Sequence, residues 1–160
     1  MTFVDSIAAR PTLRMQRHFD APRPLVWRAW TSPEIRVLWM GPVEWPMVSG
    51  AGDFRVGGEW RACLRSPDTG ENLWQGGVYR EIVPEERLVF TFKWDESHED
   101  GPPVDTLVTV QLSDAPDGGT LMDFTHEGLK SEQSLTGHKH GWTSTFERLE
   151  AFLQDQATGD

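Results

Sequence analysis

The sequence predicts an α+β domain in which helices cover one side of a curved antiparallel sheet. Three observations support this fold class. About six segments in the middle of the chain alternate apolar and polar residues and are separated by turn-forming residues, as antiparallel strands are. One strand-like segment and two short helical segments precede them. The last segment, residues 131–153, changes to an apolar period of three or four residues, which is typical of an amphipathic helix.

The first strand is expected over residues 12–19, where apolar residues such as Leu13 alternate with polar ones. Pro22 and Pro24 end this strand. Prolines are tolerated in the first turn of a helix, because that turn needs no amide donors. A short helix is therefore expected to follow over residues 25–31.

A second short helix is expected directly afterwards. Ser32 is a typical N-cap residue, and Pro33 occupies the first helical position. Leu38 and Trp39 continue an apolar pattern with helical spacing. Gly41, followed by a proline, is expected to end the helix.

The middle of the chain is expected to form an antiparallel meander. Its strands are predicted over residues 51–56, 59–65, 73–83, 88–94, 106–112 and 121–126. The alternation is clearest where Phe90 and Phe92 point one way and Thr91 and Lys93 the other. The long polar loop over residues 95–105 is interpreted as a solvated hairpin tip.

The closing helix over residues 131–153 is long enough, at about 1.5 Å per residue, to cross a whole sheet. Trp142 and Phe146 lie four residues apart on its apolar face. Gly137 and Gly141 each disfavour a helix by up to about 1 kcal/mol relative to alanine. We therefore expect either that the helix passes close to another backbone there, or that it begins after Gly137.

Length and composition predict a single domain, because a chain of 160 residues has room for one core. We assign the domain to residues 11–160 and expect residues 1–10 to be flexible. The net charge of −10 and the scattered basic residues disfavour binding to nucleic acid or to an anionic membrane. The single cysteine, Cys63, excludes an internal disulfide. With no recognisable signal peptide and no apolar run of about 20 residues, the sequence predicts a cytoplasmic protein without membrane insertion.

The order of the segments also carries a family resemblance. The matching stretches are residues 19–22, 26–31, 32–34 with Trp39, 56–58, 77–91, 125–129 and 138–142. Together they resemble the AHSA-type family, the homologues of the activator of the heat-shock chaperone ATPase, within the START/Bet v-like helix-grip (SRPBCC) superfamily. The resemblance implies seven strands wrapped around a long C-terminal helix, with a cavity between them. It does not settle the function, because that superfamily hosts binders, cyclases, hydrolases and chaperone modulators.

The candidate site depends on what the aromatic side chains do, since eight tryptophans could either fill the core or line a hollow in it. Apolar walls with a few polar groups are typical of small-molecule sites. Under the cavity interpretation, the predicted lining residues are Trp39, Met40, Trp60, Trp74, Phe90, Phe92, Val108, Val110, Phe124, His126, Trp142 and Phe146. The leading hypothesis is therefore non-enzymatic binding of a small hydrophobic or amphipathic molecule, such as a lipid, in a cavity between the sheet and the closing helix, without a cofactor.

Histidines offer the main alternatives. His126, which alternates with Phe124, is either a buried neutral imidazole or a group that orients a ligand. His138 and His140 lie about 200° apart on a helix and cannot share a metal ion. His126 and His138 could approach each other but lack a third ligand, so no metal site is predicted. A cyclase- or hydrolase-like enzyme would need His126 as its titrating group.

The family resemblance adds a second alternative, a modulator of a chaperone ATPase with a heat-shock chaperone as its partner. This hypothesis rests on the resemblance alone and names no surface of the chain. Apolar edge strands would also suit a homodimer.

Overall fold

The computed structural model describes residues 2–96 and 101–158. Within them it contains four helices and a seven-stranded sheet. The elements are α1 (Phe3–Ala9), β1 (Thr12–Phe19), α2 (Arg23–Thr31), α3 (Pro33–Trp39), β2 (Met47–Gly52), β3 (Glu59–Arg65), β4 (Asn72–Val83), β5 (Arg87–Trp94), β6 (Thr106–Asp114), β7 (Thr120–Glu127) and α4 (Glu132–Thr158). The predicted α+β helix-grip fold is confirmed. No helix in these residues is both long and apolar enough to cross a membrane.

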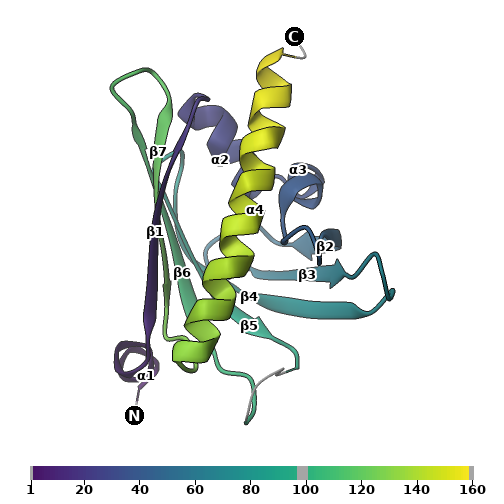
Figure 1. The fold of residues 1–160 in the computed structure, drawn as a ribbon. Coiled ribbons are helices and arrows are strands. Elements are labelled where there is room, and N and C mark those ends of the chain that lie inside the picture. Colours follow the sequence, from purple (N-terminus) through teal and green to yellow (C-terminus); the bar gives the residue numbers. More distant parts are fainter. Residues whose placement is uncertain (1, 97–100, 159–160) are drawn as a thin grey trace.

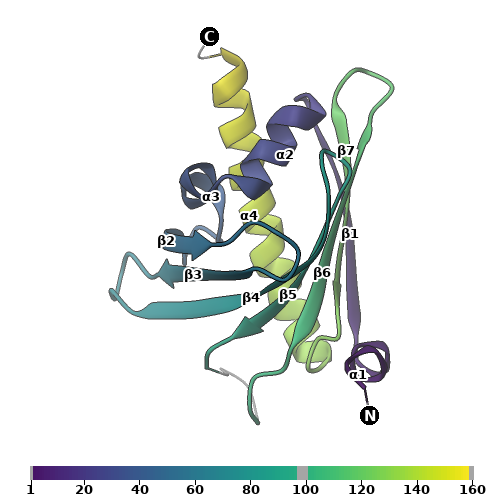
Figure 2. The same ribbon diagram turned by 180° about the vertical axis from the view of Figure 1, so that it is seen from behind.

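The sheet is open and antiparallel, with the strand order β1-β7-β6-β5-β4-β3-β2. It curves around α4, which crosses its concave side (Figure 1). Consecutive strands β1 and β2 lie at opposite edges of the sheet, so the chain between them has to cross from one edge to the other. Helices α2 and α3 make that crossing on the same side as α4 (Figure 2).

Helix α4 packs on the sheet through a stripe of buried side chains at helical spacing. Trp142, Phe146, Leu149 and Leu153 are all less than a tenth exposed. This is the stripe that the sequence predicts. The helix extends a few residues beyond the predicted end at residue 153.

Aromatic rings fill the interior between α2, the sheet and the middle of α4. Trp30 of α2 is the centre of this cluster, with its ring centroid 5.0–6.5 Å from those of Trp39, Phe90, Phe124, Trp142 and Phe146. All six side chains are buried. In this part of the molecule the rings form a packed core, because edge-to-face and offset contacts at such distances leave little space between them.

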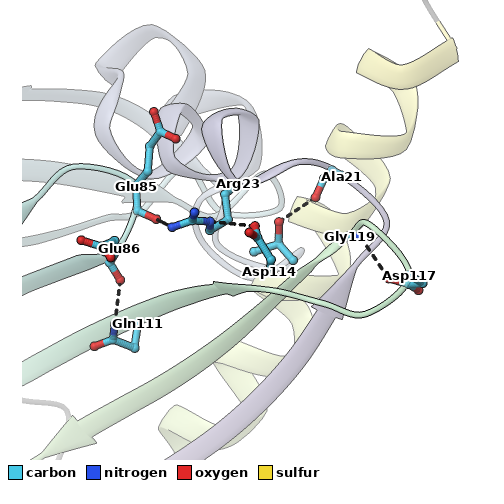
Figure 3. Close-up of polar contacts among 9 residues, drawn as sticks. Ala21, Arg23, Glu85, Glu86, Gln111, Asp114, Asp117 and Gly119 are labelled. Carbon is cyan, nitrogen blue, oxygen red and sulfur yellow. Dashed lines mark hydrogen bonds and ion pairs between the residues drawn. The ribbon is translucent and has the colours of Figure 1, made fainter.

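Polar contacts fix the beginning of α2 to the turns of the sheet (Figure 3). The Arg23 guanidinium donates from Nε to the Asp114 carboxylate at 2.8 Å and from Nη1 to the Glu85 carbonyl at 3.1 Å. The buried Thr120 hydroxyl donates to the Ala21 carbonyl at 2.6 Å. These bonds join α2 to the β4–β5 turn and to β6 and β7, which holds the crossing segment in place over the sheet.

Two segments differ from the expectation. The strand predicted over residues 51–56 is β2, Met47–Gly52, and residues 53–58 form a turn in which Gly57 has φ +87° and the Gly58 amide donates to the Arg55 carbonyl. The difference arises because β2 is an edge strand, in which only Met47 is buried and apolar alternation is therefore weak.

Helix α1 is the second difference, because no element was predicted before residue 12. Thr2 and Asp5 form a capping box that supplies acceptors for the first amides of this helix. The predicted flexibility of residues 1–10 concerns motion and stays a prediction. In the loop predicted over residues 95–105, residues 97–100 lie outside the described part of the chain.

Candidate ligand-binding cavity

A cavity of about 260 Å³ lies between the first half of α4 and the β3–β5 part of the sheet, and it is open to solvent. The segment after α3 forms a further wall. Most of the lining side chains are apolar, including Met40, Trp45, Leu64, Leu73, Phe92 and Trp94. The aromatic residues thus do two things in different places: they pack densely around Trp30 and border open space nearer the start of α4.

Gly137 and Gly141 form part of the α4 wall. A Cβ atom added at either position would meet no atom within 4 Å, so no backbone approaches closely here. The helix also begins before Gly137, at Glu132. Both reasons expected for these glycines are therefore wrong. Their lack of side chains instead leaves the cavity open along one face of the helix.

A smaller inner hollow of about 20 Å³ lies next to the cavity. Met40, Gln75, Phe92 and Trp142 line both spaces. The hollow is about large enough for a single small polar group, since one water molecule needs roughly 10–15 Å³ by this measure.

Polar groups from three elements line the inner hollow. Arg36 of α3 is only 7% exposed, and its Nη1 donates to the Tyr79 hydroxyl of β4 at 3.2 Å. The Arg36 Nε and the Trp30 Nε1 are buried, and neither has a hydrogen-bond partner in the described part of the chain. Gln75 of β4 is 6% exposed. The hollow therefore combines apolar walls with several N–H donors.

Arg148 of α4 holds the segment after α3 against that helix. Its guanidinium donates to the carbonyls of Met40 at 2.9 Å, Gly41 at 2.8 Å and Leu38 at 3.3 Å. Partial burial lowers the pKa of Arg148 from its ordinary value. These bonds satisfy the carbonyls at the end of α3 and fix the position of the Met40 wall.

His126 of β7 is fully buried and both ring nitrogens are hydrogen-bonded. The Trp142 indole donates to Nδ1 at 3.1 Å. The proton therefore sits on Nε2, which lies 2.8 Å from the Thr106 hydroxyl, and that hydroxyl donates to the Phe92 carbonyl at 2.6 Å. Burial, and secondarily the neighbouring His138, lower the pKa of His126 well below its usual value. This imidazole is a neutral link between three strands and α4.

His138 borders the cavity and packs against His126, with 5.0 Å between the ring centroids. Its Nε2 accepts from the Trp94 indole at 3.1 Å, which places the proton on Nδ1, 2.8 Å from the Ser134 carbonyl. His140 points away, with an exposed side chain. Among the described residues, no group of three or more His, Cys, Asp or Glu side chains is arranged to hold a metal ion.

The structure places the twelve predicted lining residues in different surroundings. Three line both spaces: Met40, Phe92 and Trp142. Two line the inner hollow alone: Trp60 and Phe90. Six lie in the buried interior away from both spaces: Trp39, Val108, Val110, Phe124, His126 and Phe146. Trp74 is 42% exposed and lies beneath the Arg61 guanidinium, on the face opposite its neighbours Leu73 and Gln75. A role for these residues in ligand binding stays a prediction.

Sequence reasoning missed several wall residues, of which Arg36 and Gln75 carry polar groups. A signal for Arg36 was present, because it lies three residues before Trp39 and four before Met40 and so falls on the inward stripe of α3. Gln75 was missed because its neighbour Trp74 is large and apolar. Alternation along the strand then predicts that Trp74 faces inward and Gln75 faces solvent, which is the reverse of what the structure shows.

The fold and the cavity between sheet and closing helix define a helix-grip protein. The sequence pattern of the family described as "Activator of Hsp90 ATPase homolog 1-like protein" matches residues 20–154. The chain belongs to this AHSA1 family.

Solved structures agree with this assignment. A protein from Rhizobium leguminosarum is 29% identical over 90% of this chain and 94% of its own, with a TM-score of 0.74. Protein CV1439 from Chromobacterium violaceum is 25% identical over 89% of this chain and 97% of its own, with a TM-score of 0.76. The AHSA1 protein from Silicibacter pomeroyi shares the fold, with 21% identity, coverage of 91% and 99% and a TM-score of 0.78.

No curated protein matches the chain. The family fold is consistent with a ligand-binding or a co-chaperone role.

Proposed function

We propose that the protein binds a small hydrophobic or amphipathic molecule, without converting it, in the cavity between the sheet and α4. The observation that carries this proposal is the open, largely apolar cavity of about 260 Å³. Its volume lies just below the range of roughly 300–1,000 Å³ typical of small-molecule sites, which favours a small guest. The two cavity-lining glycines support the proposal, because alanine at either position would strengthen the helix but narrow the space.

The polar groups in the wall favour binding over catalysis. The contact that most resembles a catalytic pair is between the Ser134 hydroxyl and Nδ1 of His138, at 3.3 Å. Because Trp94 donates to Nε2, the ring carries its proton on Nδ1 and has no lone pair there to accept a proton from Ser134. His126 is likewise occupied on both nitrogens and lines neither space.

The test is a substitution on α4 whose larger side chain occupies the cavity. Gly141→Leu adds a branched side chain to a helical position with open space in front of it, so the variant should fold. Wild-type protein is titrated with apolar probes such as decanol and naphthylethanol, and binding is followed by calorimetry and by thermal stability. Decanol binding is also followed by tryptophan fluorescence, since Trp45, Trp94 and Trp142 line the cavity. We expect wild type to bind at least one probe and Gly141→Leu to lose at least about tenfold in affinity.

Lys139→Leu is the matched control, because it adds a leucine to an exposed position of the same helix that borders neither space. It should bind the probes as wild type does. Equal binding by wild type and Gly141→Leu would place the guest elsewhere and contradict the proposal. So would a broad panel of apolar probes that produces no heat, no fluorescence change and no stabilisation.

A further inference from the structure

Arg36 is a buried cation whose charge no carboxylate balances within the described part of the chain. Its side chain takes part in none of the ion pairs found there, and its one side-chain hydrogen bond goes to the neutral Tyr79 hydroxyl. Nε has no acceptor among the residues that the structure describes. The chain has 25 acidic residues against 15 Lys and Arg, yet no carboxylate of the described residues forms an ion pair with Arg36.

Such an arrangement is unfavourable in the protein alone. Moving a charged group out of water is strongly disfavoured unless an opposite charge and hydrogen bonds replace the water. Arginine also stays charged under all ordinary conditions, so it cannot escape the cost by losing its proton. A buried, unpaired guanidinium therefore indicates a site prepared for an anion that comes from outside the chain.

The position of Arg36 shows where that anion would sit. Arg36 lines the inner hollow, which lies next to the open cavity and shares Gln75, Met40, Phe92 and Trp142 with it. A guest with its apolar body in the open cavity can thus reach the guanidinium with a small polar end. The hollow of about 20 Å³ suits a planar carboxylate better than a bulkier phosphate or sulfonate.

Other groups around the hollow complement a carboxylate. The Tyr79 hydroxyl accepts from Arg36 and keeps its own hydrogen for another acceptor. The Gln75 side chain, which takes part in no hydrogen bond among the described residues, lines both spaces. Trp30, whose Nε1 has no hydrogen-bond partner among the described residues, lines the same hollow.

We propose that the guest of this protein is an amphipathic carboxylic acid, bound with its carboxylate at Arg36 and its apolar body against α4. This inference rests on the proposed binding function and specifies its ligand class. The apolar body of the acid is either aliphatic or aromatic, and matched probes of both kinds distinguish the two. The probes are decanoate with decanol, and naphthylacetate with naphthylethanol, so that each pair differs mainly in the acidic group.

Binding is measured by calorimetry at neutral pH. Wild type should bind at least one acid about 10- to 100-fold more tightly than its matched alcohol, as charge-assisted hydrogen bonds in a buried site predict. Arg36→Met, which keeps the apolar stem, should lower the acid affinity to that of the alcohol. Tyr79→Phe, which removes only a hydroxyl, should lower the acid affinity several-fold. Lys139→Leu, which removes an exposed positive charge on α4 that borders neither space, should leave the acid preference unchanged.

The stability of unliganded Arg36→Met separates a binding role from a structural one. If Arg36 serves to bind an anion, the variant should unfold at the same or a higher temperature than wild type, because the substitution removes an unpaired buried charge. A large loss of stability would assign Arg36 to the scaffold and overturn the inference. If the variant does not fold, unchanged acid affinity in Tyr79→Phe overturns the inference.

The two proposals fail in different ways. Equal binding of acids and alcohols by wild type, or an acid preference that survives in Arg36→Met, overturns the carboxylate assignment and leaves the cavity function standing. Failure of every probe, acidic and neutral, to bind wild type contradicts the cavity function itself.

Discussion

His126 is a histidine kept neutral by its surroundings. Trp142 needs an acceptor at Nδ1, and Thr106, whose hydrogen goes to the Phe92 carbonyl, needs a donor at Nε2. Protonation at Nδ1 would oppose the Trp142 indole N–H and would place a charge in a site without solvent. This single ring therefore joins β5, β6, β7 and α4 in one polar network inside the core, and it does so only in its uncharged form.

The neutral state of His126 predicts how stability depends on pH. Its pKa in the folded protein lies well below the value of about 6.5 expected in the unfolded chain. Below pH 6.5 the unfolded chain binds a proton that the folded protein excludes, so stability falls as the pH is lowered from there towards the folded pKa. Over this range, His126 lowers the free energy of unfolding by up to about 1.4 kcal/mol for each pH unit.

Urea unfolding of wild type and His126→Gln between pH 5 and pH 8 checks this prediction. The variant should be less stable at pH 8, because its amide cannot reproduce both hydrogen bonds, by roughly 1–3 kcal/mol. It should also lose less stability than wild type on going to pH 5. Identical pH slopes in the two proteins would mean that His126 titrates in the folded state as it does in the unfolded chain.

At the scale of elements, the glycines of α4 and of β4 make opposite predictions. Gly141→Ala should stabilise the protein by up to about 1 kcal/mol, because alanine favours the helix and its Cβ meets nothing. Gly77→Ala should destabilise it severely, because a Cβ there would overlap the Thr91 backbone carbonyl of the neighbouring strand. Chemical denaturation measures both effects, and a Gly141→Ala variant less stable than wild type would contradict the open-space explanation.

The elements that the sequence predicts well are those whose pattern is set by burial on one face. Strand β3 matches its predicted residues 59–65, since Trp60 and Leu64 are buried and alternate with exposed arginines. Edge strand β2 buries almost nothing and was displaced in the prediction. Helix α1 is short and is defined by its capping box more than by an apolar face.

The candidate site could be predicted only in part, because a cavity depends on how far apart the packed elements lie. Local alternation correctly places Phe92 and Trp142 on inward faces, but it gives the same answer for Phe124, which lies in the packed core. What separates them is the distance between α4 and each strand, which depends on the whole chain. The spacing of Arg36 from Trp39 and Met40 indicates that Arg36 faces inward, but a short helix does not show what lies opposite it.

At the scale of the whole molecule, the interior is divided into two parts. The part around Trp30 is densely packed except for the small inner hollow that Trp30 helps to line, and α2 ties this part to the turns of the sheet. The part beneath the start of α4 is open and has apolar walls. Such a division lets one small domain keep a rigid frame while leaving space for a guest, because the stability comes from the packed half.

The two glycines of α4 have a consequence for motion. They lie in the part of the helix that borders open space, whereas residues 146–153 are anchored by Phe146, Leu149 and Leu153. Transient opening should therefore concentrate in residues 135–142, whose amide protons should exchange with deuterated solvent faster than those of the anchored turns. A bound guest would slow amide exchange in this segment selectively. The exchange rate of residues 135–142 would therefore show whether the cavity beneath them is occupied.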